Sequence, residues 1–188
     1  MFRLCSGNVP ATKIAGLPTR ARRGSVRRMS EPPQIDLTSD DYFMREALRL
    51  AQMAYADDEV PVGAVIVRER RIIARAHNQV ETLHDATAHA EMLAITQAAN
   101  ALGDWRLEGC SLFVTKEPCP MCAGAITLSR VARVVFGVRD ERAGGAGSVF
   151  DITSCPGLNH KVEVASGVRE DDARLLLQSF FRAKRAAS

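Results

Sequence analysis

The residues best suited to chemistry lie in two short stretches, His89-Ala90-Glu91 and Pro118-Cys119-Pro120-Met121-Cys122. Together they supply one imidazole, two thiols and one further carboxylate. This donor set suits Zn²⁺, which binds Cys and His side chains in tetrahedral geometry. Three protein ligands leave a fourth position for a water molecule, and a bound zinc ion can lower the pKa of that water to about 7. We therefore predict a catalytic zinc site formed by His89, Cys119 and Cys122, with Glu91 as a proton carrier.

The spacing within each stretch restricts how it can fold. Cys119 and Cys122 are three residues apart, so both sulfur atoms lie on one face of the first turn of a helix. A helix N-terminus also favours the thiolate form that metal binding requires. His89 and Glu91 are only two residues apart, and a regular helix would point them to different sides. For both to reach one water molecule, His89 must therefore precede the regular part of its helix.

A closed structural zinc site is the main alternative, together with two buried cysteines and a core histidine that bind no metal. A closed site needs a fourth ligand, and the remaining candidates show no matching spacing: His77, His84, Cys110 and Cys155. The pattern H-x-E followed by P-C-x-x-C is, in contrast, the signature of zinc-dependent nucleobase deaminases. The catalytic interpretation therefore accounts for more of the pattern.

Helical and strand patterns alternate along the chain around these stretches. Ser39 can cap a helix in which Phe43, Ala47, Leu50 and Ala54 form one apolar stripe. Further helices are predicted over 88–102, 121–129 and 169–184, and strands over 64–67, 71–76, 111–115, 131–138 and 161–165. This alternation predicts a three-layer α/β/α domain with a five-stranded mixed sheet.

The charge of the chain is unevenly distributed. The 188 residues carry 25 Lys and Arg against 22 Asp and Glu, a formal charge of +3. Residues 1–28 contain seven of the basic residues and no acidic one, which leaves 18 basic against 22 acidic, a formal −4, for 29–188. If this part binds RNA, it must do so through a local patch rather than through an overall positive field.

The first 36 residues contain Pro, Gly, Ser and Arg without apolar periodicity, and we predict a disordered extension over 1–36 before a deaminase domain over 37–188. An organellar transit peptide, a basic arm for RNA, or translation that starts at Met29 remain alternatives for this segment. The chain has no apolar run of the roughly 18 residues that a membrane span needs, so we expect a soluble protein that is not inserted in or bound to a membrane. Scattered cysteines suggest no disulfide framework and favour a cytoplasmic location.

With these residues in place, the chain resembles the bacterial tRNA-specific adenosine deaminases over about 40–185. Beyond the zinc motif, the resemblance rests on Asn78 and on these segments: Glu59-Val60-Pro61-Val62-Gly63-Ala64-Val65, His84-Asp85, Val134-Val135-Phe136-Gly137 with Asp140, Gly147-Ser148, and Phe180-Phe181-Arg182. The first and last of these favour the tRNA branch over cytidine, deoxycytidylate or guanine deaminases.

The resemblance implies a cytidine-deaminase-like fold, a homodimer with one Zn²⁺ per subunit, and a tRNA anticodon stem-loop as partner. It implies that the wobble adenosine is converted to inosine. By position, Asn78 would contact the adenine, Val62 and Asp140 would line the pocket, and Phe181 would stack or pack near a flanking nucleotide. Ordinary structural roles remain open for these four: turn capping, core packing, a solvated acid in a turn, and an apolar helix face.

The chain departs from the family pattern at Ala86, where Pro is usual, at Lys116, which replaces an apolar residue, and at Val138, which replaces a small Ala. None of the three touches the metal ligands or Glu91, so they leave the reaction type unchanged. Ala86 loosens the loop before His89, and Val138 narrows the space near the pocket, so we expect a different preference for the base that flanks the target. Two other functions compete with the tRNA deaminase: a free-base or nucleoside deaminase acting on guanine, cytosine or cytidine, and a non-enzymatic zinc or RNA-binding module.

Overall fold

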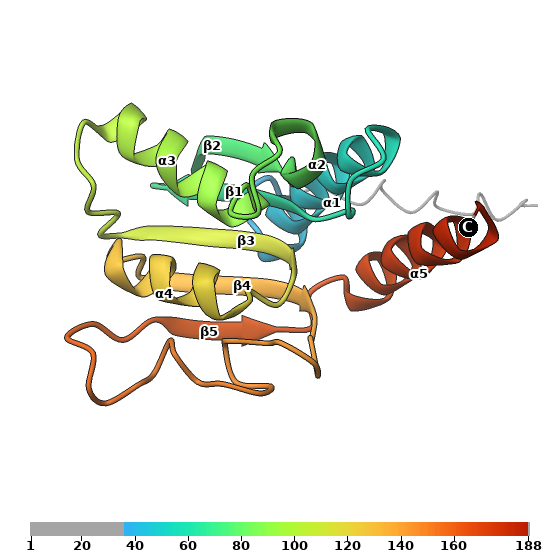
Figure 1. The fold of residues 1–188 in the computed structure, drawn as a ribbon. Helices are drawn as coiled ribbons and strands as arrows, with labels where there is room; N and C mark the ends of the chain where they lie inside the picture. The colour runs from blue at the N-terminus through green and yellow to red at the C-terminus, as the bar shows by residue number, and fades with distance from the viewer. Residues whose placement is uncertain (1–35, 188) are drawn as a thin grey trace, which may run out of the picture. The chain divides into compact units, whose positions relative to one another are not determined.

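Five strands form one mixed sheet in the order β2-β1-β3-β4-β5 (Figure 1). The computed structural model describes residues 36–187. Strands β1, β2 and β3 are antiparallel neighbours, whereas β4 and β5 continue the sheet parallel to β3. The strands span β1 Gly63–Arg68, β2 Arg71–His77, β3 Cys110–Lys116, β4 Arg133–Val138 and β5 Glu163–Ser166. The predicted five-stranded mixed sheet is therefore confirmed.

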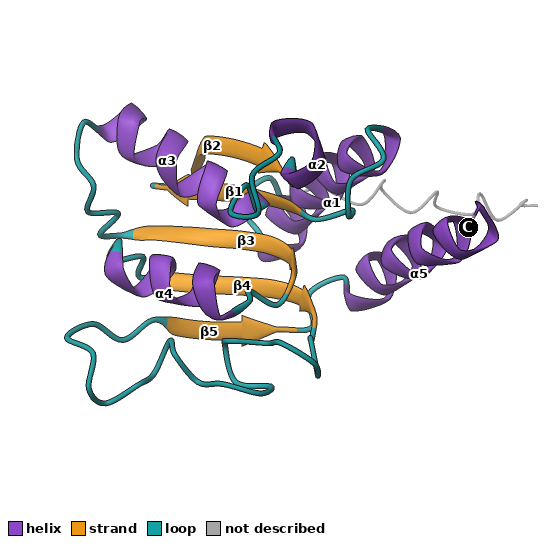
Figure 2. Cartoon of the chain, in the orientation of Figure 1, coloured by secondary structure: helices purple, strands orange, loops and turns teal. Residues whose placement is uncertain are grey.

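Helices cover both faces of the sheet, as Figure 2 shows. Alternate residues of β1 point to opposite faces: Ile66 packs in the cluster that contains α3 and α4, and Val65 in the cluster that contains α1 and α5. This gives the predicted α/β/α layering. The helices span α1 Asp40–Ala56, α2 Val80–Leu83, α3 Ala90–Leu102, α4 Pro120–Leu128 and α5 Glu170–Ala187.

The N-terminal half of the fold is built from local signals that the sequence displays. Ser39 caps α1, because its hydroxyl accepts a hydrogen bond from the backbone N–H of Tyr42 at 3.2 Å. Glu69 and Arg70 form the two-residue turn between β1 and β2, both with positive φ, as such a tight hairpin requires. Gly63 lies so close to α1 that an added Cβ would stand 2.1 Å from the carbonyl oxygen of Ala47. A glycine is therefore needed there for α1 to rest on the sheet.

Most predicted elements occur within two residues of their expected bounds. The short helix α2 was missed because it is too short for any periodicity to reveal. The last strand begins at Glu163 rather than at 161, since Val162 is still in the preceding loop and bonds to Thr153 there. The predicted disordered extension, 1–36, lies outside the described residues except for Asp36. No helix in the described range, 36–187, is long and apolar enough to span a bilayer.

Candidate active site

His89 and Glu91 lie at the beginning of α3. His89 is the N-cap residue and has an extended backbone, with φ −71° and ψ 151°. Glu91 is in the first helical turn and is only 4% exposed. Because His89 precedes the regular helix, both side chains line the same cavity. The predicted position of His89, before the regular turns, is confirmed.

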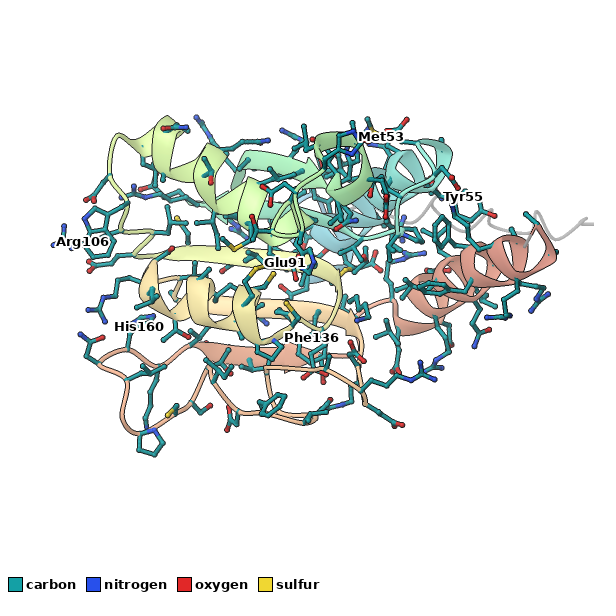
Figure 3. All side chains as sticks on the ribbon, viewed as in Figure 1. Met53, Tyr55, Glu91, Arg106, Phe136 and His160 are labelled. Atoms are coloured by element: carbon teal, nitrogen blue, oxygen red, sulfur yellow. The ribbon has the colours of Figure 1, made fainter. Side chains whose placement is uncertain are left out.

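The two cysteines lie at the beginning of α4. Cys119 is the N-cap residue, Pro120 is the first helical residue, and Cys122 lies in the first turn and is fully buried. Proline suits this first position because its missing N–H would have no partner in the helix. The N-termini of α3 and α4 therefore meet at one place, and Figure 3 shows Glu91 there, with sulfur atoms near it in the view.

The three predicted metal donors come together. His89 Nδ1 lies 3.4 Å from Cys122 Sγ and 3.6 Å from Cys119 Sγ. All three donor atoms are within 4.8 Å of one another. Tetrahedral zinc, with bonds of about 2.3 Å to sulfur and 2.0–2.1 Å to nitrogen, requires nitrogen–sulfur separations of about 3.6 Å. The observed distances and the nature of the donors therefore fit a zinc ion held by these three side chains.

The electrostatics of the cluster favour a thiolate. The pKa of Cys119 is lowered to about 4, chiefly because the Cys122 thiol donates a hydrogen bond to it. The same hydrogen bond, together with burial, raises the pKa of Cys122. The hydrogen bond with Cys119 raises the pKa of His89. Burial raises the pKa of Glu91, which makes its carboxylate a better proton acceptor than an exposed glutamate.

The cluster opens into a cavity of about 860 Å³. Three of the four predicted substrate-binding residues, Val62, Asn78 and Phe181, line this cavity. Phe180 is 5% exposed and packs edge-on against Tyr55 of α1, which Figure 3 labels, at 5.5 Å between ring centroids. Phe181 is 44% exposed at the cavity. The C-terminal helix thus buries Phe180 in the core and leaves Phe181 partly exposed at the cavity.

Asp140, the fourth predicted substrate-binding residue, lies beside the cavity and is not among its lining residues. Its carboxylate accepts hydrogen bonds from the backbone N–H groups of Arg142 and Ala143 at 3.0 and 3.3 Å. The Lys116 ammonium also binds it, and this ion pair lowers the pKa of Asp140 although burial opposes the shift. Lys116 itself lines the cavity, so the departure at this position places an ammonium group next to the site.

Glu117 is a buried acid whose role is not evident from the sequence. Its carboxylate accepts hydrogen bonds from the backbone N–H groups of Asp140, Ala146 and Ser148 at 2.9, 3.2 and 3.0 Å, and from the Ser148 hydroxyl. Gly144 leaves room for it, since a Cβ there would lie 2.5 Å from the carboxylate. Glu117 therefore holds the loop after β4 against the segment that carries the cysteines.

Glu59 is a second buried acid of this kind, in the loop before β1. Its two oxygens accept hydrogen bonds from the backbone N–H of Thr82 at 2.7 Å and from the Asn78 amide at 3.1 Å. The sequence offers one signal for both acids: each is a carboxylate that stands beside an apolar strand rather than on a polar face. Their partners are backbone groups distant in sequence, which no local pattern reveals.

A second hollow, of about 680 Å³, adjoins the cavity and shares Lys116 and Phe181 with it. It lies between the loop after β4 and α5. Among its described lining residues are six basic ones and no acidic one: Lys116, Arg139, Arg142, Arg174, Arg182 and Arg185. We call these six residues the basic groove.

Comparison with known proteins places the chain in a family. Residues 37–138 match the family described as the cytidine and deoxycytidylate deaminase zinc-binding region. A tRNA-specific adenosine deaminase of Bacillus subtilis (strain 168) is 51% identical over 146 residues, which cover 78% of this chain and 91% of the relative. That of Aquifex aeolicus (strain VF5) is 50% identical over 140 residues, covering 74% and 93%.

Solved structures agree with this assignment. A structure from a study of A-to-I editing by tRNA:A34 deaminases at the wobble position is 43% identical, with a TM-score of 0.71, and covers 72% of this chain and 99% of its own. A guanine deaminase from Nitrosomonas europaea is 27% identical, with a TM-score of 0.64, and covers 80% and 88%. The chain therefore belongs to the zinc-binding cytidine and deoxycytidylate deaminase family and, within it, to the tRNA-specific adenosine deaminases.

Proposed function

We propose that this protein hydrolyses the exocyclic amine of adenosine at the wobble position of a tRNA anticodon loop, which yields inosine and ammonia. The observation that carries this proposal is the convergence of His89, Cys119 and Cys122 at a cavity whose wall also contains the buried Glu91. The choice of a tRNA adenosine as substrate rests on the relatives that are named tRNA-specific adenosine deaminases. Residues 37–188 would form the deaminase domain.

In this proposal His89, Cys119 and Cys122 hold one Zn²⁺ per chain. When bound, zinc makes water acidic enough to supply hydroxide near neutral pH. The N-terminus of α4 and the neighbouring thiol favour the thiolate form of Cys119. This form suits a metal ligand, because cysteine binds the metal when it is deprotonated.

Glu91 would move the protons. Its carboxylate would take a proton from water and deliver it to N1 of the adenine ring as hydroxide adds at C6. It would then take the proton of the new C6 hydroxyl and deliver it to the departing amine, so that the C6–N bond breaks and ammonia leaves. Burial raises the pKa of Glu91, and this supports a carboxyl group that exchanges protons near neutral pH.

The remaining cavity residues would hold the nucleotide. We assign Asn78 to the adenine, Val62 to the apolar wall, and Phe181 to stacking on a flanking base. Base–aromatic stacking contributes about 1–3 kcal/mol per base, and the exposure of Phe181 supports this role. Asp140 would line the pocket at its edge, where it forms an ion pair with Lys116.

The basic groove supports an RNA partner. It adjoins the cavity and, within the described residues, contains four arginines outside any ion pair, Arg139, Arg142, Arg182 and Arg185. Such groups bind phosphodiester oxygens without sequence preference. An anticodon loop suits this arrangement, because its bases are already partly unstacked and can enter a pocket at little cost.

We further propose a homodimer that acts in the cytoplasm. The dimer is supported by apolar side chains that are exposed on α4 and on the loop after β4, Leu128, Val149 and Phe150. The cytoplasm is supported by free thiols at all four cysteines within the described range.

A guanine deaminase is the second candidate, because the guanine deaminase of Nitrosomonas europaea has a similar fold. The two are separated by substrate. The purified protein should form inosine in a synthetic anticodon stem-loop with adenosine at the wobble position, and should release no comparable ammonia from free guanine, cytidine or adenosine. Rapid turnover of free guanine with no reaction on the RNA would reject the tRNA assignment.

A further inference from the structure

The Glu59 side chain is an ionised group inside the wall of the active-site cavity. It is 1% exposed. Burial raises the pKa of this carboxyl, but hydrogen bonds from the backbone N–H groups of Thr82 and Glu81 and from the Thr82 and Asn78 side chains outweigh that effect and leave the pKa lowered. Glu59 is therefore an anion at neutral pH, and a carboxylate anion can only accept hydrogen bonds.

This charge determines which way the Asn78 amide faces. Asn78 must turn its Nδ2 group toward Glu59 Oε2, at 3.1 Å, because its carbonyl oxygen would repel the anion. No buried side-chain nitrogen or oxygen in residues 36–187 lacks a hydrogen-bond partner, and the Asn78 amide makes its hydrogen bond through Nδ2 alone. The Asn78 Oδ1 atom is therefore accessible, and Asn78 lines the cavity.

We propose that Glu59 is a positioning residue that fixes the hydrogen-bonding sense of Asn78, so that the cavity presents the Oδ1 acceptor to a donor group of the target nucleoside. The inference rests on the proposed function and specifies how that site selects its substrate. Adenosine offers such donors at its exocyclic amine and its ribose hydroxyls. A free amide could rotate and offer its N–H groups instead, whereas an amide held by an anion cannot.

The substitution Glu59→Gln tests this directly, because it preserves shape and removes the charge. The introduced glutamine must still use its carbonyl oxygen to accept the Thr82 N–H, which lies 2.7 Å from the carboxylate in the parent protein. Its amide N–H₂ then faces Asn78, and Asn78 must rotate to accept from it. The N–H groups of Asn78 would then face the cavity at the place where the parent protein presents the Oδ1 acceptor. A mismatched or unpaired polar contact of this kind lowers kcat/KM by about 10- to 100-fold.

A compensating variant restores the acceptor. In Glu59→Gln/Asn78→Asp, the amide of the introduced glutamine donates to one oxygen of the introduced aspartate, and the other oxygen faces the cavity. We therefore expect at least tenfold higher kcat/KM for the double variant than for either single variant at neutral pH. Asn78→Asp alone places two carboxylates about 3 Å apart, where both cannot stay ionised without repulsion. Such recovery is a direct coupling between the two residues.

The measurement is inosine formation in a synthetic anticodon stem-loop with adenosine at the wobble position, with kcat and KM determined separately. The affinity of the same RNA is measured with each variant in a Glu91→Ala background, so that binding is read without turnover. Glu117→Gln/Asn78→Asp is the matched control: it removes the charge of another buried acid that does not contact Asn78, and it should show no recovery.

Wild-type kcat/KM in Glu59→Gln, or a double variant that is less than tenfold more active than the better single variant, would overturn the inference. Recovery by the Glu117 control would do the same, because it would show that any loss of charge suffices. Failure of the proposed function is distinct from both results, since the parent protein itself would then form no inosine.

Discussion

Two buried glutamates of the cavity, Glu91 and Glu59, show how the surroundings of one residue type assign it different chemistry. Burial without enough hydrogen bonds raises the pKa of Glu91, whereas several N–H donors lower that of Glu59. A carboxylate with raised proton affinity can exchange protons, and one saturated with donors stays charged and orients its neighbours. The first therefore suits catalysis and the second suits positioning.

Replacing Glu91 should separate chemistry from metal binding. We expect Glu91→Gln to lower the rate of inosine formation by about 10²–10⁴-fold, which is the usual contribution of general acid–base catalysis. Zinc content and affinity for the stem-loop should stay near those of the parent protein, because Glu91 is not one of the three clustered donors. Single-turnover rates and metal analysis of the purified variant measure both. A variant with parental turnover would remove Glu91 from the mechanism.

At the scale of elements, the site is made where α3 and α4 begin. Each helix contributes an N-cap residue with extended backbone, His89 and Cys119, and a side chain from its first turn. Two buried acids fix the surrounding loops: Glu59 ties α2 to the loop before β1, and Glu117 ties the loop after β4 to the cysteine segment. The N-termini of α3 and α4 therefore position the metal-binding side chains, and Glu59 and Glu117 stabilise the loops that form the cavity walls.

The hold of Glu59 on α2 predicts a pH dependence of stability. Its folded-state pKa is lowered relative to an unfolded value of about 4.3. The ionised group thus stabilises the fold above about pH 4.3, and this contribution is lost as the pH falls through the folded-state pKa. Glu59→Gln should lower the free energy of unfolding by about 1–3 kcal/mol at pH 7. The gap between variant and parent should narrow as the pH is lowered below about 4.

Urea unfolding of both proteins at neutral and acidic pH measures this gap. Replacement of the exposed Glu108 by Gln is the control and should change the free energy of unfolding little at either pH. A gap that widens on acidification would show that Glu59 is neutral in the folded protein.

The metal donors and the sheet could be predicted from the sequence because their signals are local. The spacing of Cys119 and Cys122 and the two-residue step from His89 to Glu91 already required two helix N-termini. The roles of Glu59 and Lys116 could not be predicted, because their partners Thr82 and Asp140 approach only after the sheet assembles. On α5, the apolar residues did not reveal which ring is buried; contact with Tyr55 places Phe180 inside and leaves Phe181 exposed.

At the scale of the whole molecule, basic side chains cluster in the groove beside the active-site cavity. Residues 29–188 have a formal charge of −4, yet the basic groove brings six basic side chains together beside the cavity. Residues from β3, the loop after β4 and α5 contribute to it, so neither a single segment nor the net charge predicts the groove. The groove is therefore a local basic patch of the kind that a domain with a net negative charge would need in order to bind RNA.

Charge removal in the groove should weaken RNA binding in a salt-dependent way. Arg142→Ala and Arg182→Ala should each reduce affinity for the anticodon stem-loop and decrease the slope of log K against log salt by up to about 0.7–1. Arg106→Ala is the control, because Arg106 does not line the groove and lies at one edge of the domain, away from Glu91, in Figure 3; it should leave the slope unchanged. Unaltered slopes in both groove variants would place the RNA elsewhere.

The measurement that tests the central claim most directly is a zinc titration of metal-depleted protein, followed by inosine formation in the anticodon stem-loop. We predict that activity rises linearly and reaches its plateau at one zinc ion per chain, and that Cys119→Ala neither binds zinc tightly nor gains activity, since too few ligands remain. Full inosine formation by the zinc-free protein, or a normal zinc content in Cys119→Ala, would contradict the account.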